Sequence, residues 1–424
     1  MAANAQPHLA DLHAQAAEAG VAGYRKLTRA ELMEALGLEP EKVELEPGEV
    51  EVEGTVLEPA PDAPFEEDSA GPRERDEPTV ELGGVLEVTR QRFGFLRLGG
   101  LVPGDDDVYI SAAQVRRCEL RPGDHVVGPA REPRRGERHR ALVHVDQVNG
   151  EAPEAEEGRP LFDDLSPALP EKRVELDAPG ADVLLRAVDL FAPLALGQRV
   201  LIRAAARSGR TTLLRALARA ASAGPAATAV VLLIDERPEE APAWREALPE
   251  AELAIATADL APVEQVRIAE LATERARRLA ESGTDVILVC DSLSRLAHAA
   301  GGIDEVKRLF GTGRNLAGGG SVTVIATTLA DGSDDGAADR AVLTTESSLI
   351  TLDPELAAAG VYPAIIATQC RVSNEDELRD ADELEAVRQL RSLLSDLDPP
   401  EAARLLRERI EGSASNADLL KDLR

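Results

Sequence analysis

The chain has 424 residues, a formal net charge of −30 and an isoelectric point near 4.6. This length allows two or three domains, and so acidic a chain repels nucleic-acid phosphates unless its basic residues gather locally. No stretch is long and apolar enough to span a membrane, and the N-terminus lacks the order of a secretory signal. The three cysteines are far apart, which excludes a metal-binding spacing and predicts a reduced, cytoplasmic location.

The first eighty residues predict a helical segment followed by a linker. Residues 8–40 carry apolar side chains at helical spacing, and Thr28 and Glu31 form a capping box. Residues 41–82 hold fifteen acidic and three basic residues, a composition typical of a disordered, solvated linker. A second interpretation is that this acidic segment imitates RNA and competes for a binding surface.

The next segment, residues 83–150, predicts a small β-barrel. Turn residues separate five short strands, at 85–88, 93–97, 107–111, 125–127 and 141–145. Such spacing favours a five-stranded barrel of the oligonucleotide-binding (OB) type. The segment is locally basic, with eleven arginines against nine acids.

Three aromatic residues in this segment predict a binding surface for single-stranded RNA. Phe93 and Phe95 are two positions apart, so we expect them on one strand face, and Tyr109 lies in the next strand. Bases stack on such rings for about 1–3 kcal/mol each. The alternative is that these rings simply fill the barrel core.

A second acidic linker, 151–158, leads into a segment that predicts a phosphate-binding loop. A hydrophobic strand at 200–202 is followed by small residues and then by apolar residues at helical spacing. Backbone N–H groups at the start of a helix can hold phosphate oxygens. Gly209 supplies the tight turn and the Thr211 hydroxyl can reach Mg²⁺, but Arg210 stands where a lysine is usual. An ordinary strand–turn–helix is the alternative.

Carboxylates follow two further buried strands. Glu236 comes just after the apolar run 230–234, and Asp291 ends the run 285–290. An aspartate at such a place can hold a metal's water shell and a glutamate can polarise an attacking water, as phosphoryl transfer requires. The alternative is that both acids only cap the helices that follow.

The C-terminal residues 380–424 predict charged, amphipathic helices. Leu384, Val387, Leu390 and Leu394 lie at the spacing of one helical face.

Four motifs together carry a family resemblance. They are VLLIDERPEE (231–240), DVILVCDSLSRLA (285–297), KRLFGTGRN (307–315) and GGSVTVIATTL (319–329). They resemble the motor domain of the bacterial Rho family of transcription termination factors, and the resemblance extends back through 161–167 and 197–202.

The resemblance implies a multidomain α/β fold. A small N-terminal helical domain (8–40) and a cold-shock barrel of OB type (83–150) precede a RecA-type P-loop NTPase domain with C-terminal helices (159–424). It also implies a cytoplasmic homohexamer that uses ATP and Mg²⁺ to pull single-stranded RNA through a ring and to release transcripts from RNA polymerase.

The resemblance also assigns site residues. The catalytic residues are Glu236, Asp291 and Arg210, and the metal site is Thr211 and Asp291. The nucleotide-binding residues are Gly197, Gln198, Arg199, Arg207, Ser208, Gly209, Arg210, Thr211, Thr212, Arg237 and Tyr362, whose ring would stack on adenine. The RNA-binding residues are Arg92, Phe93, Gly94, Phe95, Leu96, Arg97, Asp107, Val108, Tyr109, Glu137, Arg138 and His139, the last standing where the family usually has an aromatic residue.

Four departures from the family pattern keep two hypotheses open. The departures are Arg210 in the loop, a short pore loop between Ala300 and Lys307, acidic residues at 332–335 in place of a pore lysine, and Ser373 at the arginine-finger position with Arg371 nearby. An arginine finger can contribute about 10³–10⁵ in rate. The chain is therefore either an active RNA-dependent ATPase of the Rho type or a Rho-derived RNA- and nucleotide-binding protein with weak or no ATPase activity.

Overall fold

A computed structural model describes residues 78–156, 158–170, 172–223, 227–330 and 336–421, with Ala19, Leu36 and Leu423 as single positions. The helical domain predicted for residues 8–40, the acidic linker up to residue 77 and the segment 332–335 lie outside the described residues. The chain divides into two compact units, Met1–Glu74 and Arg75–Arg424, and only the second is considered below. Within the described ranges, no helix has the length and apolar character needed to cross a membrane.

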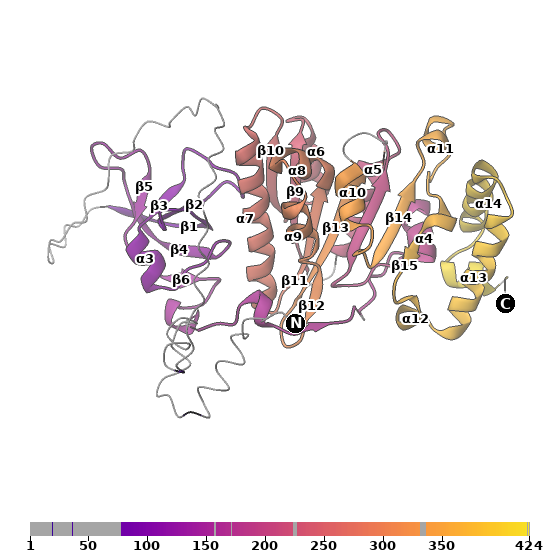
Figure 1. The fold of residues 1–424 in the computed structure, drawn as a ribbon, viewed down its shortest axis with the longest axis horizontal. Coiled ribbons are helices and arrows are strands. Elements are labelled where there is room, and N and C mark those ends of the chain that lie inside the picture. Colours follow the sequence, from indigo (N-terminus) through magenta and orange to yellow (C-terminus); the bar gives the residue numbers. More distant parts are fainter. Residues whose placement is uncertain are drawn as a thin grey trace, which may run out of the picture. The chain divides into compact units, whose positions relative to one another are not determined.

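A closed β-barrel begins the described part of the chain (Figure 1). Its strands are β1 (Thr79–Val88), β2 (Gly94–Arg97), β3 (Val108–Ile110), β4 (His125–Arg131), β5 (Arg140–Leu142) and β6 (Gln147–Val148). They pair in the order β1-β2-β3-β5-β4, β4 also pairs with β1, and β6 adds to β4. Closure removes the exposed edges of the sheet, and apolar residues such as Leu86, Leu96 and Val126 fill the interior.

The barrel differs from the sequence prediction in three places. β1 begins at Thr79, inside the stretch predicted to be linker. A short helix, α3 (Ala112–Arg117), follows β3, because Ser111 and Gln114 form a capping box that the strand pattern concealed. Phe93 precedes β2 instead of lying within it.

A mostly parallel sheet forms the centre of the second domain. Its strands β10 (Glu252–Thr257), β9 (Ala227–Glu236), β11 (Asp285–Asp291), β13 (Ser321–Leu329), β8 (Arg199–Ala204) and β14 (Ser348–Leu352) are parallel and lie in this spatial order. The antiparallel additions are β15 (Arg371–Val372) on β14, and β12 (Arg314–Leu316), which joins β13 to β7 (Pro167–Ala168). The carboxyl ends of the parallel strands share one edge, where open α/β sheets bind ligands.

Helices cover both faces of this sheet, so its strands are apolar on both sides. One face packs against α4 (Val183–Phe191), α5 (Arg210–Ala221), α6 (Glu240–Ala247), α13 (Ala381–Ser395), α14 (Pro399–Glu411) and α15 (Asn416–Lys421). The other packs against α7 (Pro262–Glu281), α8 (Leu293–Ala300), α9 (Asp304–Phe310) and α10 (Gly336–Val342). The remaining short helices are η2 (Pro153–Glu156), η3 (Phe162–Asp164), α11 (Pro354–Ala358), η4 (Ala367–Gln369) and α12 (Glu375–Leu378).

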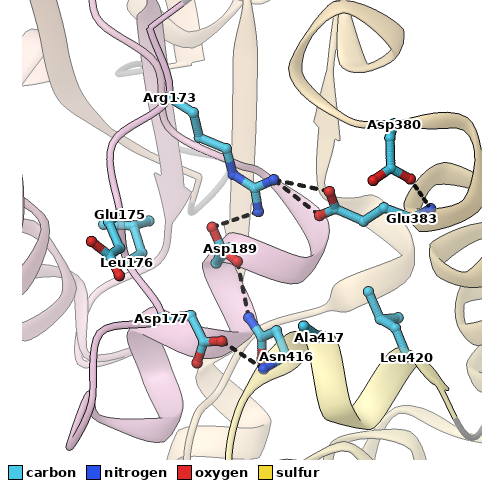
Figure 2. Close-up of a pocket in the computed structure, with 10 residues that line it drawn as sticks. All are labelled: Arg173, Glu175, Leu176, Asp177, Asp189, Asp380, Glu383, Asn416, Ala417 and Leu420. Carbon is cyan, nitrogen blue, oxygen red and sulfur yellow. Dashed lines mark hydrogen bonds and ion pairs between the residues drawn. The ribbon is translucent and has the colours of Figure 1, made fainter.

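Charged residues attach the C-terminal helices to α4, around a cavity of about 430 Å³ (Figure 2). Arg173 contacts Asp189 of α4 at 2.8 Å and Glu383 of α13 at 2.9 Å. The Asn416 side chain of α15 donates to Asp189 at 3.0 Å, and its backbone N–H donates to Asp177 at 2.6 Å. These acids are thus satisfied within the protein, which indicates a structural role for the network.

Candidate nucleotide and RNA sites

The loop between β8 and α5 has the geometry of a phosphate cradle. It spans residues 205–209, in which Arg207 and Gly209 have left-handed backbone conformations with φ of 64° and 88°. The Ser208 hydroxyl donates to the Ala205 carbonyl at 2.8 Å and closes the turn. Because Gly209 is the N-cap residue, no side chain caps the twelve-residue helix α5. Its first amides are therefore open to an anion.

Arg210, the first residue of α5, lies against Asp291 at the end of β11. Its Nη2 is 3.2 Å from Asp291 Oδ1, which also accepts a hydrogen bond from the Thr327 hydroxyl at 3.0 Å. Asp291 is only 1% exposed. Three buried atoms of this pair have no hydrogen-bond partner among the described residues, namely Arg210 Nε and Nη1 and Asp291 Oδ2. Since an unsatisfied buried polar group costs about 1–3 kcal/mol, a bound ligand that pairs with these atoms would stabilise the site.

Glu236 ends β9, the neighbour of β11, and is 9% exposed. Arg295 Nη1 donates to Glu236 Oε2 at 2.8 Å and to the Ile234 carbonyl at 3.2 Å. Burial by itself lowers the pKa of Arg295, but the hydrogen bond and charge of Glu236 outweigh it and raise that pKa. Because β9 and β11 run parallel in register, Glu236 and Asp291 reach the same edge of the sheet.

Tyr362 stands in the segment that follows β14. The last residue of β14, Leu352, lies opposite Ala204 at the end of β8, which brings the start of this segment beside the phosphate loop. The Tyr362 hydroxyl donates to Asp182 at 2.6 Å, and its ring is 38% exposed. Burial, together with the Asp182 carboxylate, raises the pKa of Tyr362. A ring held in this way can stack on a nucleobase.

The predicted nucleotide-binding residues fall into two groups in the structure. The loop residues and those that follow β8 and β9 lie at the carboxyl edge of the sheet: Arg207, Ser208, Gly209, Arg210, Thr211, Thr212 and Arg237. Gly197, Gln198 and Arg199 lie at the opposite end of β8, about 17 Å away for a six-residue strand.

The contacts of this second group are structural. The Gly197 N–H donates to the Thr323 hydroxyl at 2.9 Å, and buried Gln198 accepts from Ala195 at 2.9 Å. Arg199 donates to two backbone carbonyls, at 2.6 and 2.9 Å. The length of β8 separates these three residues from the loop, and their assignment to nucleotide binding stays a prediction.

The segment in which an arginine finger was expected lies along β15, the antiparallel strand that pairs with β14 at the side of the sheet. Ser373 follows β15, and its N–H donates to the Ser347 carbonyl at 2.9 Å. Arg371 of β15 is exposed and is ion-paired with Glu346. Arg371 is thus the one arginine in the sequence from 367 to 378, a range that the structure describes in full.

On the barrel, Phe93, Phe95, Tyr109 and His139 form a half-buried group of rings, here called the aromatic cluster. Ring centroids are 5.8 Å apart for Phe93–Phe95, 5.5 Å for Phe93–Tyr109 and 5.1 Å for Phe95–His139. Burial and the charge of Glu137 raise the pKa of Tyr109. No hydrogen-bond partner of His139 Nδ1 lies within the described part of the chain. Partly exposed rings in this arrangement are suited to stacking with bases.

Other predicted RNA-binding residues are interior. Leu96 and Val108 are buried in the barrel core, and a Cβ on Gly94 would come within 2.6 Å of Leu86. Arg97 is 6% exposed, is ion-paired with Glu87 and Asp107, and lies 5.5 Å from the Phe95 ring centre. The structure places these four side chains inside the barrel, and the assignment of the residues to RNA binding stays a prediction: Leu96, Arg97, Asp107 and Val108.

The surface residues of the predicted RNA site remain available. Arg92 is exposed in a left-handed turn, with φ of 68°, and Arg138 is exposed beside Asp105 at 2.9 Å. Glu137 contacts Arg131 at 2.6 Å. This hydrogen bond from Arg131, aided by a backbone N–H, lowers the pKa of Glu137.

The sequence did not predict the role of Glu87, which pairs with Arg97 beside the aromatic cluster. Its carboxylate accepts from Arg97 Nε at 2.9 Å and is also ion-paired with Arg267 of α7. The only sequence signal was an acid in an otherwise apolar strand. Thr327, which contacts Asp291, gave a similarly faint signal as a hydroxyl at the end of a buried strand.

Comparisons with known families match two parts of the chain. The Rho termination factor RNA-binding domain matches residues 82–154. The nucleotide-binding domain of the ATP synthase alpha/beta family matches residues 185–311. An ATPase from the type III secretion system of pathogenic bacteria has a similar solved structure, with a TM-score of 0.50 and 22% identity over 61% of this chain and 87% of that one. These findings confirm the predicted OB-type barrel and P-loop NTPase fold.

Three relatives named transcription termination factor Rho are similar over most of this chain. The one from Streptosporangium roseum is 38% identical, covering 83% of this chain and 94% of the relative. The one from Chromobacterium violaceum is 36% identical, covering 80% and 87%. The one from Streptomyces lividans is 36% identical over 81% of this chain, which spans about half of that relative (52%).

Proposed function

The chain belongs to the family of transcription termination factor Rho, and from this premise we propose that it is an RNA-binding, ATP-dependent translocase that releases nascent transcripts from RNA polymerase. We propose further that it acts as a cytoplasmic homohexamer. Its RNA-binding barrel would span residues 79–150 and its ATPase domain residues 159–424. The proposal rests on one observation, that a phosphate cradle and two strand-end carboxylates, Asp291 and Glu236, meet at one edge of the sheet.

The nucleotide is held by the loop and its neighbours. The open amides of α5 and the unpartnered donors of Arg210 receive phosphate oxygens. Glu236, held in place by Arg295 at 2.8 Å, orients and polarises the attacking water. Tyr362 stacks on the base.

The residues present are compatible with Mg²⁺. Thr211 lies in the first turn of α5, and the buried Asp291 Oδ2 has no other partner among the described residues. We propose that the Thr211 hydroxyl and, through water, the Asp291 carboxylate hold the ion. Mg²⁺ supplies charge neutralisation to a transferring phosphoryl group.

Single-stranded RNA lies across the aromatic cluster. Bases stack on Phe93, Phe95 and Tyr109, while Arg92 and Arg138 contact phosphates. The barrel is locally basic, and charges farther away than the Debye length of about 8 Å are screened at physiological salt. The overall charge of −30 therefore does not oppose this binding.

The alternative hypothesis, a binding protein that has lost its ATPase activity, is not favoured. Identity of 35–38% to proteins named Rho extends across both the barrel and the motor. The Glu236–Arg295 pair and the Asp291 carboxylate are both in place at the sheet edge.

The test is phosphate release from ATP, with and without pyrimidine-rich RNA. We expect turnover that RNA stimulates and that depends on Mg²⁺. Bound ATP and bound RNA without any turnover would instead support the alternative hypothesis. A second measurement, the mass of the assembly in solution, should give six copies, and a stable monomer under the conditions of turnover would refute the proposed hexamer.

A further inference from the structure

The phosphate loop carries an arginine where a lysine is usual, and the surroundings of Arg210 show what this changes. A lysine presents one nitrogen at the end of its side chain, whereas a guanidinium presents three in a rigid fork. Among the described residues, only Nη2 of the three nitrogens has a partner, Asp291 Oδ1 at 3.2 Å. Nε and Nη1 are buried without a hydrogen-bond partner in the described part of the chain.

The partner of Arg210 is held in place independently. Asp291 is 1% exposed, and its Oδ1 also accepts a hydrogen bond from the Thr327 hydroxyl at 3.0 Å on the adjacent strand β13. Arg210 can therefore stay against Asp291 while its two remaining donors bind another acceptor. Nε–H and Nη1–H lie on different edges of the guanidinium, so each can donate a separate charge-assisted hydrogen bond to a phosphate oxygen.

We propose that Arg210 bridges Asp291 and a phosphate of the bound nucleotide, so that nucleotide binding does not depend on a divalent cation. The inference rests on the proposed function, because it concerns the same phosphate loop. The positive guanidinium sits between two groups that are both negative, a carboxylate and a phosphate. It thereby offsets, for binding, part of the charge that Mg²⁺ neutralises.

The test is the dissociation constant of ADP measured by titration calorimetry, in Mg²⁺ and in EDTA. For the natural protein we expect the two values to differ by less than about threefold, because the guanidinium–phosphate contacts persist without metal. For Arg210→Lys we expect ADP affinity in EDTA to fall by roughly tenfold or more, the value of one charge-assisted hydrogen bond. In Mg²⁺ the variant should bind nearly as well as the natural protein.

A matched control makes the same arginine-to-lysine substitution at a position away from the phosphate loop. Arg215→Lys lies on the same helix, where Arg215 contacts Glu240 at 3.3 Å and the Trp244 ring. This variant should bind ADP like the natural protein in both buffers. Arg210→Gln, whose folding is checked by its unfolding midpoint, should also lose binding in EDTA.

Two outcomes would overturn the inference. One is a natural protein whose ADP affinity collapses in EDTA, and the other is an Arg210→Lys variant that retains affinity there. If the natural protein binds no ADP in either buffer, it is the proposed function that fails. The two failures are therefore distinguishable.

Discussion

Two arginines, buried Arg97 in the barrel and partly exposed Arg210 in the motor, have opposite surroundings. Arg97 is enclosed by Glu87 and Asp107 and lies beside the Phe95 ring. Arg210 has one carboxylate partner, Asp291, and two donors left over. Where a buried charge is fully paired inside the protein, removing one partner destabilises the fold. A buried donor without a partner indicates a place for a ligand.

Residues such as Arg97 hold a site in shape, whereas we propose that residues such as Arg210 act in one. In the barrel, the interior charges support the rings, and we propose that the rings and exposed arginines such as Arg92 and Arg138 contact RNA. In the motor, the charged groups at the carboxyl edge of the sheet are themselves the groups that we propose bind nucleotide and take part in turnover. Substitutions should therefore reduce stability in the barrel interior and reduce activity at the sheet edge.

The largest effect is expected at Glu236. Glu236→Gln keeps the shape and most hydrogen bonds but removes the charge that polarises water, so ATP turnover should fall by about 10²–10⁴. ADP affinity and the unfolding midpoint should change little. If steady-state turnover survives at more than a tenth of its normal value, Glu236 is not the water-polarising group.

Substitution of Arg97 should instead lower the stability of the barrel more than it lowers activity. Arg97→Met leaves Glu87 and Asp107 without their main partner, and breaking such a buried network costs about 3–5 kcal/mol of unfolding free energy. Denaturant unfolding of the barrel, followed by its circular dichroism, measures the loss. Arg138→Met is the matched control, because Arg138 is 77% exposed and an exposed pair contributes within about 1 kcal/mol. Equal effects at the two positions would contradict the comparison.

The aromatic cluster should affect binding without affecting the fold. Replacing Phe93 and Phe95 together by alanine should lower the affinity for a short pyrimidine-rich RNA at least tenfold, since each stacked base contributes about 1–3 kcal/mol. Fluorescence anisotropy at a fixed salt concentration measures this. Val80→Ala, at a position on β1 that is 48% exposed, serves as the control. Unaltered RNA affinity in the double variant would remove the stacking site.

The smallest effect is expected at Glu137, as a change in how the stability of the barrel depends on pH. Arg131 holds the pKa of Glu137 below its ordinary value of 4.5. A depressed pKa in the folded state means that the pair stabilises the barrel above pH 4.5 and that this contribution is lost as the pH falls through the lowered pKa. The difference in unfolding midpoint between the natural protein and Glu137→Gln should therefore be present at neutral pH and shrink under acid. If the difference in unfolding midpoint instead grew as the pH fell, the pKa of Glu137 would be raised on folding and not lowered.

Much of the nucleotide site was predictable from local sequence. Buried parallel strands appear as apolar runs, and the residues just after them must lie at the carboxyl edge, so Gly209, Asp291 and Glu236 could be placed together. The assignment of Gly197 to Arg199 came from the family resemblance, and these residues are close to the loop only in sequence. They stand at the start of β8, whereas the phosphate loop follows its end, and an extended strand keeps its two ends far apart.

The barrel shows what local sequence could not supply. A pattern of short alternating strands predicts a barrel and its aromatic residues, because side-chain direction repeats every two residues. Which polar residues point inward depends on pairing between strands. Glu87 lies opposite Phe95, and Arg97 reaches Glu87 and Asp107, each ten positions away along the chain. Partners at such separations meet only when the register of the closed sheet is set, and so the interior role of Arg97 emerged from the folded protein alone.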